Sequence, residues 1–267
     1  MYATHPRANV LGIGISAIDM ERAVALSDTL IQSGERGYVC VTGVHGIMES
    51  QADAAFRDIL NGAFMTTPDG MPTVWVGHWQ GYHKMSRVYG PDYMLEMCRL
   101  SVVRGYRQFL CGGKPGTAQK LASELVRRFP GLQIAGTFTP PFRRLTRVEE
   151  EELAAQVSSS KPDIFWVGLS TPKQERFMSE YVHRLDVKLM AGVGAAFDIH
   201  VGATRDSPAW VKSAGLQWLH RLCQEPRRLW KRYLINNPAF LWNLGLQLTH
   251  MKRFDLDLPT NSIVQSR

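Results

Sequence analysis

The sequence predicts an α/β fold with a mostly parallel sheet flanked by helices, followed by a helical, basic C-terminal appendage. Up to about residue 200, short apolar runs rich in β-branched and aromatic residues alternate with segments of helical period. This alternation is typical of βα units and predicts a Rossmann-like arrangement. Beyond it, the segment from Arg205 to Arg253 contains nine Lys and Arg residues and two acidic residues. Its net charge equals the net charge of the whole chain, +7. We therefore expect an α/β domain over residues 1–204 and an appendage over residues 205–267.

The individual elements follow from the period of the apolar residues. Strands are expected at residues 9–15, 38–44, 64–67, 108–111, 132–137, 163–169 and 187–193. Helices are expected at residues 17–33, 46–61, 91–104, 116–129, 147–158 and 173–184. The basic segment after residue 205 reads as several short helices in which tryptophans alternate with Arg and Lys.

Composition narrows the class of protein. The chain has 267 residues, 45% of them hydrophobic and 21% charged, as in soluble globular proteins. Its four cysteines form neither a CxxC pair nor a Cys/His cluster, so we expect buried thiols, no metal site and no bound cofactor. The first twenty residues lack the pattern of a secretory signal, and we expect a cytoplasmic location.

A glycine pattern at Gly12 to Ala17, GIGISA, matches the GxGxxA fingerprint of dinucleotide-binding folds if it closes a strand and opens a helix. No acidic residue ends the following strand, which terminates in Gly43-Val44-His45. A tight turn is the other interpretation. One alternative function is therefore a nicotinamide-dependent (NAD or NADP) oxidoreductase.

Two further loops each follow an expected strand and precede an expected helix. CGGKPG combines Gly112 and Gly113 with Lys114, which suits either a phosphate cradle or a plain turn. GLSTPKQE places Lys173 and Gln174 at the carboxyl edge of the sheet, where α/β folds bind ligands. We expect Thr171 to be the N-cap of the helix that follows.

Three acidic or basic side chains also stand at turns. After the last strand, Gly192 and Gly194 allow close approach of a ligand, and Asp198 is either a structural hydrogen-bond hub or part of a site. In RVYGPD, Arg87 could pair with phosphate or with a carboxylate. In TTPDGM, Asp69 either makes a turn or does chemistry.

The basic, tryptophan-rich segment implies an anionic partner. Its uncharged stretch, residues 233–251, is too polar for a good bilayer span. A membrane surface is one interpretation, closure of the core is a second, and a nucleic-acid-binding module is a third.

Taken together, these segments resemble the WecG/TagA/CpsF family of bacterial glycosyltransferases, glycosyltransferase family 26. The resemblance runs from about Asn9 to about Trp242 and is closest to the exopolysaccharide branch. Its carriers, in order, are MESQADAAFRDILNGAFMTTPDGMPTVW, RVYGPD, FLCGGKPG, FPGLQIAGTFTPPFR, IFWVGLSTPKQERFM, GVGAAFDIHVG and GLQWLHRLCQEPRRLWKRYLINNPAFLW.

The resemblance implies inverting transfer of a sugar from a UDP-sugar, such as UDP-glucose or UDP-N-acetylmannosamine, to a polyprenyl-diphosphate-linked saccharide. The site would lie on the inner face of the cytoplasmic membrane, to which the protein would bind peripherally. The resemblance is also compatible with a homo-oligomer. Nucleic acid is not an expected partner. By match to the family's DG motif, Asp69 would be the catalytic base.

Further roles follow from the same resemblance. Donor and nucleotide binding would fall to the two glycine-flanked loops and the last strand end, with these residues: Gly112, Gly113, Lys114, Lys173, Gln174, Gly192 and Gly194. Contacts to the acceptor's lipid diphosphate would come from Arg221, Arg227, Arg228 and Arg232. Four residues are further possible members of the active site: Thr42, His45, Arg87 and Asp198.

One departure concerns the strand before the DG motif. Many members carry Thr-x-Asn there, whereas the matching positions here are Val41 and Gly43. Thr42 and His45 lie nearby, so either they compensate or the acceptor differs.

Overall fold

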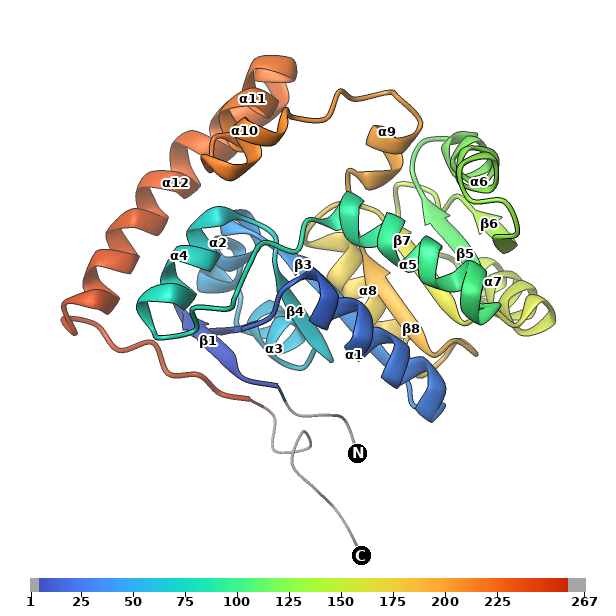
Figure 1. Cartoon of the computed structure of the whole chain (residues 1–267), viewed down its shortest axis with the longest axis horizontal. Coiled ribbons are helices and arrows are strands. Elements are labelled where there is room, and N and C mark those ends of the chain that lie inside the picture. Colours follow the sequence, from blue (N-terminus) through green and yellow to red (C-terminus); the bar gives the residue numbers. More distant parts are fainter. Residues whose placement is uncertain (1–4, 259–267) are drawn as a thin grey trace, which may run out of the picture. The chain divides into compact units, whose positions relative to one another are not determined.

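The computed structural model describes residues 5–258 and divides into two compact units (Figure 1). The first unit comprises the described parts of Met1–Met20, Val41–Tyr89 and Asp206–Arg267. The second comprises Glu21–Cys40 and Gly90–Arg205. The predicted boundary between a catalytic domain, residues 1–204, and a C-terminal appendage, residues 205–267, stays a prediction. Residues 259–267 of that appendage lie outside the described residues.

The second unit alternates strands with helices, as the apolar pattern predicts. Its strands are β5 (Arg107–Gly112), β6 (Gln133–Phe138), β7 (Ile164–Gly168), β8 (Leu189–Gly192) and the first four residues of β3 (Gly37–Thr42). Its helices are α1 (Met20–Ser33, from Glu21 on), α5 (Gly90–Arg104), α6 (Thr117–Arg128), α7 (Arg147–Ser160), α8 (Lys173–Tyr181) and α9 (Ala196–His200).

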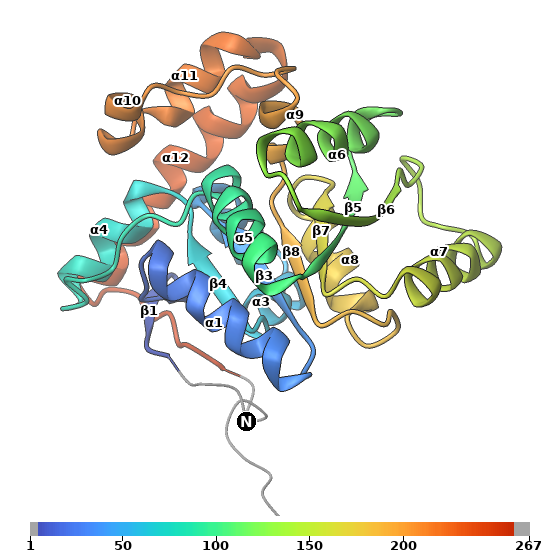
Figure 2. The same cartoon turned by 45° about the vertical axis from the view of Figure 1, so that its right-hand side comes forward.

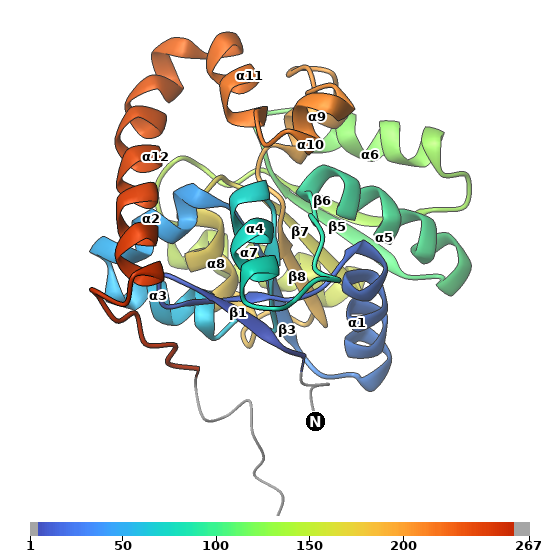
Figure 3. The same cartoon turned by 60° about the vertical axis from the view of Figure 1, so that its left-hand side comes forward.

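The sheet has the strand order β4-β3-β8-β7-β5-β6, in which β4 is Met65–Pro68 and β3 is shared by the two units. All neighbours from β3 to β6 pair in parallel. Figure 3 shows α1 and α5 on one face of these strands and α8 on the other. The architecture confirms the predicted α/β class with a mostly parallel sheet.

Aromatic side chains fill the core of the second unit. Trp166, Phe109 and Phe165 have no exposed surface, and the two phenylalanine rings stack with centroids 5.0 Å apart. Both strands have helices on each face and are buried except for Arg107 and Gly168, which explains why β5 and β7 read as nearly continuous apolar runs.

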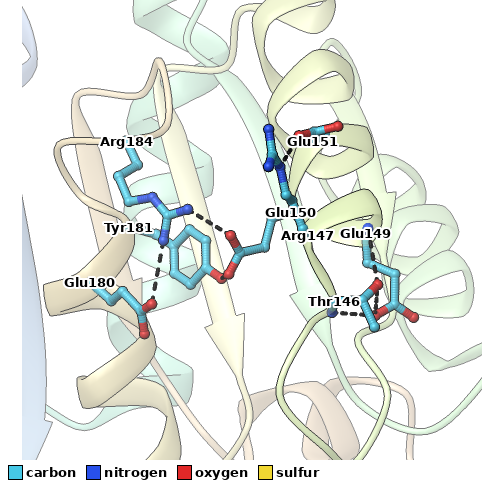
Figure 4. A network of polar contacts seen from close by, with 8 residues as sticks. All are labelled: Thr146, Arg147, Glu149, Glu150, Glu151, Glu180, Tyr181 and Arg184. Carbon is cyan, nitrogen blue, oxygen red and sulfur yellow. Dashed lines mark hydrogen bonds and ion pairs between the residues drawn. The ribbon is translucent and has the colours of Figure 1, made fainter.

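A polar network ties the end of α8 to α7 (Figure 4). Glu150 accepts hydrogen bonds from the Tyr181 hydroxyl and from Arg184, the latter at 2.6 Å. At the start of α7, Thr146 and Glu149 form a reciprocal capping box. These contacts hold the helix whose first turn carries Lys173 and Gln174.

The first unit combines a small antiparallel sheet with helices. Its strands are β1 (Arg7–Val10), β2 (Ile13–Ser16) and β4, and its helices include α2 (Val44–Ala52), α3 (Ala54–Asn61) and α4 (Met71–Trp79). The C-terminal helices are α10 (Ala209–Ser213), α11 (Gln217–Gln224) and α12 (Pro226–Leu248), and Figure 2 shows the first two beside the start of α12.

Four sequence predictions fail here for local reasons. The strand expected at 9–15 is a hairpin, because Leu11 and Gly12 adopt positive φ angles of 52° and 82° and reverse the chain. The helix expected at 46–61 breaks at Asp53, whose extended backbone ends α2 and whose carboxylate caps α3 through the Phe56 amide. Helices α4 and α9 were not expected, since neither has a clear apolar period.

The basic segment is also less fragmented than expected. Pro238 lies inside α12, which nevertheless continues over 23 residues. A proline removes one helical hydrogen bond without ending this helix, because the rest of the ladder continues on both sides. Within residues 5–258 we find no helix that combines the length and the apolarity needed to cross a membrane.

Candidate functional site

Asp69 lies directly after β4, between the last strand residue and a helix. Its amide donates to the Thr42 carbonyl of β3 at 3.2 Å, which extends the strand contact by one residue. Gly70 is the N-cap of α4, and Pro72 occupies the first turn of this helix. Residues in a first turn donate no hydrogen bond within the helix, so the lack of an N–H in proline costs nothing there. The Asp69 side chain keeps 32% of its surface exposed, so the turn presents a carboxylate rather than burying it.

Arg87 lies against Asp69 and is held from three sides. Its Nε donates to the Asp69 carbonyl and its Nη2 donates to Gln217 Oε1 of α11. Nη2 also lies 3.9 Å from Asp69 Oδ1, at the outer limit of an ion pair. The guanidinium lies over the Tyr89 ring, 4.3 Å from its centroid. Of the two partners considered for Arg87, the structure therefore places a carboxylate beside it.

Tyr89 extends this arrangement toward the C-terminal helices. Its hydroxyl donates to Asp206 Oδ1 at 3.0 Å, and Asp206 pairs with Lys212 of α10. Burial, followed by the negative charges of Asp206 and Asp69, raises the pKa of Tyr89. The phenol therefore stays protonated and serves as a hydrogen-bond donor.

The residue that adjoins the Asp69 carboxylate is Gly43, which follows β3 and is the N-cap of α2. A Cβ added there would lie 3.7 Å from Asp69 Oδ2. Thr42, the last residue of β3, is 2% exposed. His45 is held by α12, because Asn236 Nδ2 donates to its Nδ1 at 3.0 Å. Glu49 lies 3.7 Å from the same nitrogen.

A cluster of arginines gathers where α11 meets α12. Arg232 is half-buried, and burial, followed by the positive charges of Arg221 and Arg228, lowers its pKa. Arg221 Nε is buried without a hydrogen-bond partner, whereas Arg228 pairs with Glu225 at 2.7 Å. Arg227 is exposed on the first turn of α12. This cluster is therefore short of negative charge.

Tyr233 connects this arginine cluster with Asp69. Burial raises the pKa of Tyr233, Arg221 and Arg232 oppose the rise, and the charge of Asp69 adds to it. The charge of the Asp69 carboxylate and the charges of the arginines therefore both act on the Tyr233 hydroxyl. The structure brings these parts of the first unit into one region, although Asp69 and Arg232 are far apart in the sequence.

In the second unit, the glycine loop CGGKPG follows β5. Gly112 and Gly113 have φ angles of 135° and 73°, and a Cβ at Gly112 would lie 2.6 Å from the Gly168 carbonyl of β7. The Gly113 amide already donates to that carbonyl at 3.1 Å. The glycines therefore permit close strand contact, and the side chain of Lys114 beside them is exposed.

The first turn of α8 holds a buried polar pair. Gln174 is 2% exposed and Glu175 is 1% exposed, whereas Lys173 beside them is exposed. Gln174 Nε2 and the Thr171 hydroxyl both donate to Glu175 Oε1, at 3.0 and 2.8 Å. The predicted N-cap role of Thr171 is wrong: Pro172 occupies the cap position, and Thr171 bonds a side chain instead.

Glycines at the end of β8 receive the Gln174 side chain. A Cβ at Gly192 would lie 3.1 Å from Gln174 Nε2, and a Cβ at Gly194 would lie 3.5 Å from Gln174 Oε1. Both glycines therefore leave room for this amide. Asp198 follows on α9, where it is half-buried, and its backbone carbonyl accepts from the Ala203 and Thr204 amides.

The family model described as "Glycosyl transferase WecG/TagA/CpsF family" matches residues 8–253. The chain belongs to this family of glycosyltransferases. A similar protein is the N-acetylglucosaminyldiphosphoundecaprenol N-acetyl-beta-D-mannosaminyltransferase of Bacillus subtilis (strain 168), 29% identical over 68% of this chain and 69% of the relative. The enzyme of the same name from Staphylococcus aureus (strain MRSA252) is 21% identical over 92% of this chain and 95% of the relative.

The predicted site residues of this glycosyltransferase fall into two groups. The first unit holds Asp69, Arg87, Thr42, His45 and the arginine cluster of α11 and α12. The second unit holds the β5, β7 and β8 loops with Lys114, Lys173 and Gln174, and Asp198. Sequence reasoning gave no role to Tyr89, Gln217 or Tyr233, because no local pattern marks a tyrosine or glutamine that comes near Arg87 or Asp69 only after folding.

Of the two interpretations of GIGISA, the dinucleotide fingerprint is wrong in this glycosyltransferase. Gly12 lies in the turn of the β1–β2 hairpin and Gly14 lies inside β2, so neither opens a helix. A Cβ at Gly14 would meet the side chains of Arg7, Leu256 and Leu258 within 3.2 Å. These glycines serve packing, which removes the structural basis for a nicotinamide-dependent reaction.

Proposed function

We propose that this glycosyltransferase moves a sugar from a UDP-sugar to a polyprenyl-diphosphate-linked saccharide with inversion at the anomeric carbon. UDP-glucose and UDP-N-acetylhexosamines such as UDP-N-acetylmannosamine are the proposed donors. The relatives are named for transfer of N-acetylmannosamine to a diphosphoundecaprenol-linked N-acetylglucosamine, which supports a lipid-linked acceptor here. The product would enter a cell-surface polysaccharide or exopolysaccharide.

The observation that carries this proposal is the arginine cluster that shares Tyr233 with Asp69. Among the described residues, Arg221 and Arg232 are half-buried and form no ion pair, and the charge of Glu49 only weakly offsets the burial of Arg232, which favours binding of an anion. A diphosphate offers two phosphate groups with a geometry that guanidinium groups match. Arg227 and Arg228 would add to this attraction.

In the proposed reaction, the acceptor hydroxyl attacks the anomeric carbon and gives its proton to the Asp69 carboxylate. The bond from the anomeric carbon to the UDP oxygen breaks, and UDP leaves with the bonding electrons. Asp69 suits the role of general base because the turn after β4 leaves its carboxylate partly exposed. Arg87 would position the carboxylate and its backbone.

Contacts to the nucleotide sugar are proposed for the second unit. Lys114 and Lys173 are exposed cations after β5 and β7, and they would offset charge on the diphosphate. Gln174 would hydrogen-bond the donor, while Gly192 and Gly194 keep space for its amide. Asp198 and His45 are assigned no step in the reaction.

We also propose peripheral binding to the inner face of the cytoplasmic membrane. Four tryptophans of the C-terminal helices are between 37% and 71% exposed, and they alternate with arginines and lysines: Trp210, Trp218, Trp230 and Trp242. Exposed aromatic rings and cations on one segment are typical of helices that bind anionic membrane surfaces.

The proposal is tested by incubating the purified protein with a panel of UDP-sugars and a synthetic polyprenyl-diphosphate N-acetylglucosamine. We expect one UDP-sugar to give a product one sugar longer, with inverted configuration by NMR. A soluble N-acetylglucosamine without the lipid diphosphate is the control and should react far more slowly. Equal rates with both acceptors would contradict the lipid-diphosphate role of the arginine cluster.

A further inference from the structure

The buried pair at the start of α8 has two polar atoms that its neighbours leave unused. Among the described residues, neither Gln174 Oε1 nor Glu175 Oε2 has a hydrogen-bond partner, although both atoms are shielded from water. A buried polar atom without a partner is unfavourable by about 1–3 kcal/mol in typical proteins. Such atoms are rare in native structures and call for a reason.

The hydrogen bond within the pair determines which end of the Gln174 amide stays unused. Nε2 is engaged, because it donates to Glu175 Oε1 at 3.0 Å. With the carboxylic proton on Oε2, Glu175 Oε1 accepts from both Gln174 Nε2 and the Thr171 hydroxyl, so rotation of the amide by 180° would bring an acceptor against an acceptor. The carbonyl oxygen Oε1 is consequently the atom that points toward Gly194 at the end of β8.

Among the described residues, Glu175 forms no ion pair with a charged side chain. Strands β7 and β8, which pack against α8, have the sequences IFWVG and LMAG and carry no ionisable group. On α8 itself, Lys173 and Arg176 are exposed, and Glu150 of α7 contacts Tyr181 at the end of α8 and Arg184 beyond it. Burial raises the pKa of Glu175, and the hydrogen bonds from Thr171 and Gln174 only partly oppose this.

We infer that Glu175 is a neutral positioning residue: its carboxylic acid holds the Gln174 amide so that Oε1 accepts a hydrogen bond from the nucleotide-sugar donor. The inference rests on the proposed function and adds the chemistry of recognition. The recognised group is an N–H or O–H donor, either on the nucleotide or on the sugar. A Cβ at Gly192 would crowd Met178 Cε at 2.7 Å and Gln174 Nε2 at 3.1 Å, whereas Gly194 has a positive φ of 51° that favours glycine.

Three variants separate the roles of charge, hydrogen bonding and volume. Glu175→Gln keeps the shape and the neutral state, Glu175→Met keeps most of the volume without hydrogen bonding, and Gln174→Leu removes the acceptor. Glu180→Gln on the same helix, at an exposed position, is the matched control. Calorimetric titration with UDP and with UDP-glucose measures the affinity of each purified full-length protein.

We expect Glu175→Gln and Glu180→Gln to bind within about twofold of the unchanged protein. Glu175→Met and Gln174→Leu should each weaken binding about tenfold, the effect of one buried hydrogen bond. The double variant should be no weaker than either single variant, because both changes remove the same contact. Loss of affinity in Glu175→Gln, additive losses, or unchanged binding in Glu175→Met would each overturn the inference.

A second measurement needs no ligand. An acid whose pKa is raised by folding destabilises the folded state as pH rises from its unfolded pKa, about 4.3, toward the folded value. The unfolding free energy of the unchanged protein should therefore fall relative to Glu175→Gln as pH increases above about 4.3. A difference that does not vary with pH would overturn the neutral state of Glu175. If the unchanged protein binds neither UDP nor UDP-glucose, the nucleotide-sugar proposal and the recognition role fail together, whereas this measurement still decides the charge of Glu175.

Discussion

Two buried glutamines of the second unit differ in how completely their amides are used. Gln108 on β5 has no exposed surface, and its Oε1 accepts from Trp166 Nε1 at 2.8 Å, while its Nε2 donates to Ser101 at 3.0 Å. Gln174 is almost as buried, yet its Oε1 has no partner. Completed bonds indicate a structural role, whereas an unused acceptor at a strand end indicates a ligand.

The same contrast extends to the charged residues. The ion pairs of α7 and α8 are complete, whereas the arginines of α11 and α12 exceed their acidic partners. Substitution of a residue whose ion pairs or hydrogen bonds are all formed should change stability. Substitution of a residue with an unused acceptor or a surplus charge should change substrate binding or transfer. Four changes test this distinction.

The largest effect is expected for Asp69→Asn. The amide cannot accept a proton, so the transfer rate should fall roughly 10²- to 10⁴-fold, the usual contribution of a general base. Binding of UDP should persist, since the change adds no bulk. The control is Asp58→Asn, an exposed carboxylate on α3 of the same unit. A variant with normal transfer would show that Asp69 is not the base.

Gln108→Leu tests the structural half of the comparison against Gln174→Leu. We expect the unfolding free energy to fall by about 2–3 kcal/mol for Gln108→Leu, because Trp166 Nε1 and Ser101 lose their partners inside the core. Gln174→Leu should lower it by less, because only the bond from Nε2 to Glu175 Oε1 is lost and the Thr171 hydroxyl still donates to that oxygen. Denaturant unfolding measures both. Equal stability losses would break the distinction between the two glutamines.

Arg221→Gln and Arg232→Gln test the surplus positive charge. Each should weaken binding to vesicles that contain anionic lipid by roughly fivefold, corresponding to about 1 kcal/mol per basic residue at a membrane surface. Stability should be maintained, because a half-buried cation without an acidic partner is removed. Sedimentation with vesicles measures the affinity, and Arg147→Gln on the exposed face of α7 is the control. If Arg147→Gln lost as much vesicle affinity as Arg221→Gln and Arg232→Gln, the net charge of the protein alone would explain the binding, and the arginine cluster would have no specific role.

The smallest effect concerns the network of α7 and α8. The ion pair with Arg143 and the hydrogen bonds from Thr146 lower the pKa of Glu149 to about 2, and hydrogen bonds from Tyr181 and Arg184 lower that of Glu150. Because the folded pKa values are depressed, the stabilisation is present above the unfolded pKa of about 4.3 and is lost as pH falls toward 2. Denaturant unfolding between these values should show a weaker pH dependence in Glu149→Gln. Transfer activity at neutral pH should not change.

Much of the fold could be predicted because the apolar period of a strand or helix is a local property. The strands from residue 38 to residue 193 and most helices of the second unit lie where the pattern placed them. Positions such as Leu11 and Asp53 were missed because one residue's backbone angle decides them, and a short window of apolar residues does not report it.

The sequence by itself determined the α/β class, the family and the loops that carry Asp69, Lys114 and Gln174, since these depend on short segments in a fixed order. Only the tertiary structure decided which side chains surround them. It placed Gly43 beside the Asp69 carboxylate, brought Gln217 to Arg87 across 130 residues, and left Gln174 Oε1 without a partner among the described residues. Contacts between distant segments arise from packing and hydrogen-bond geometry, which no local pattern of residues encodes.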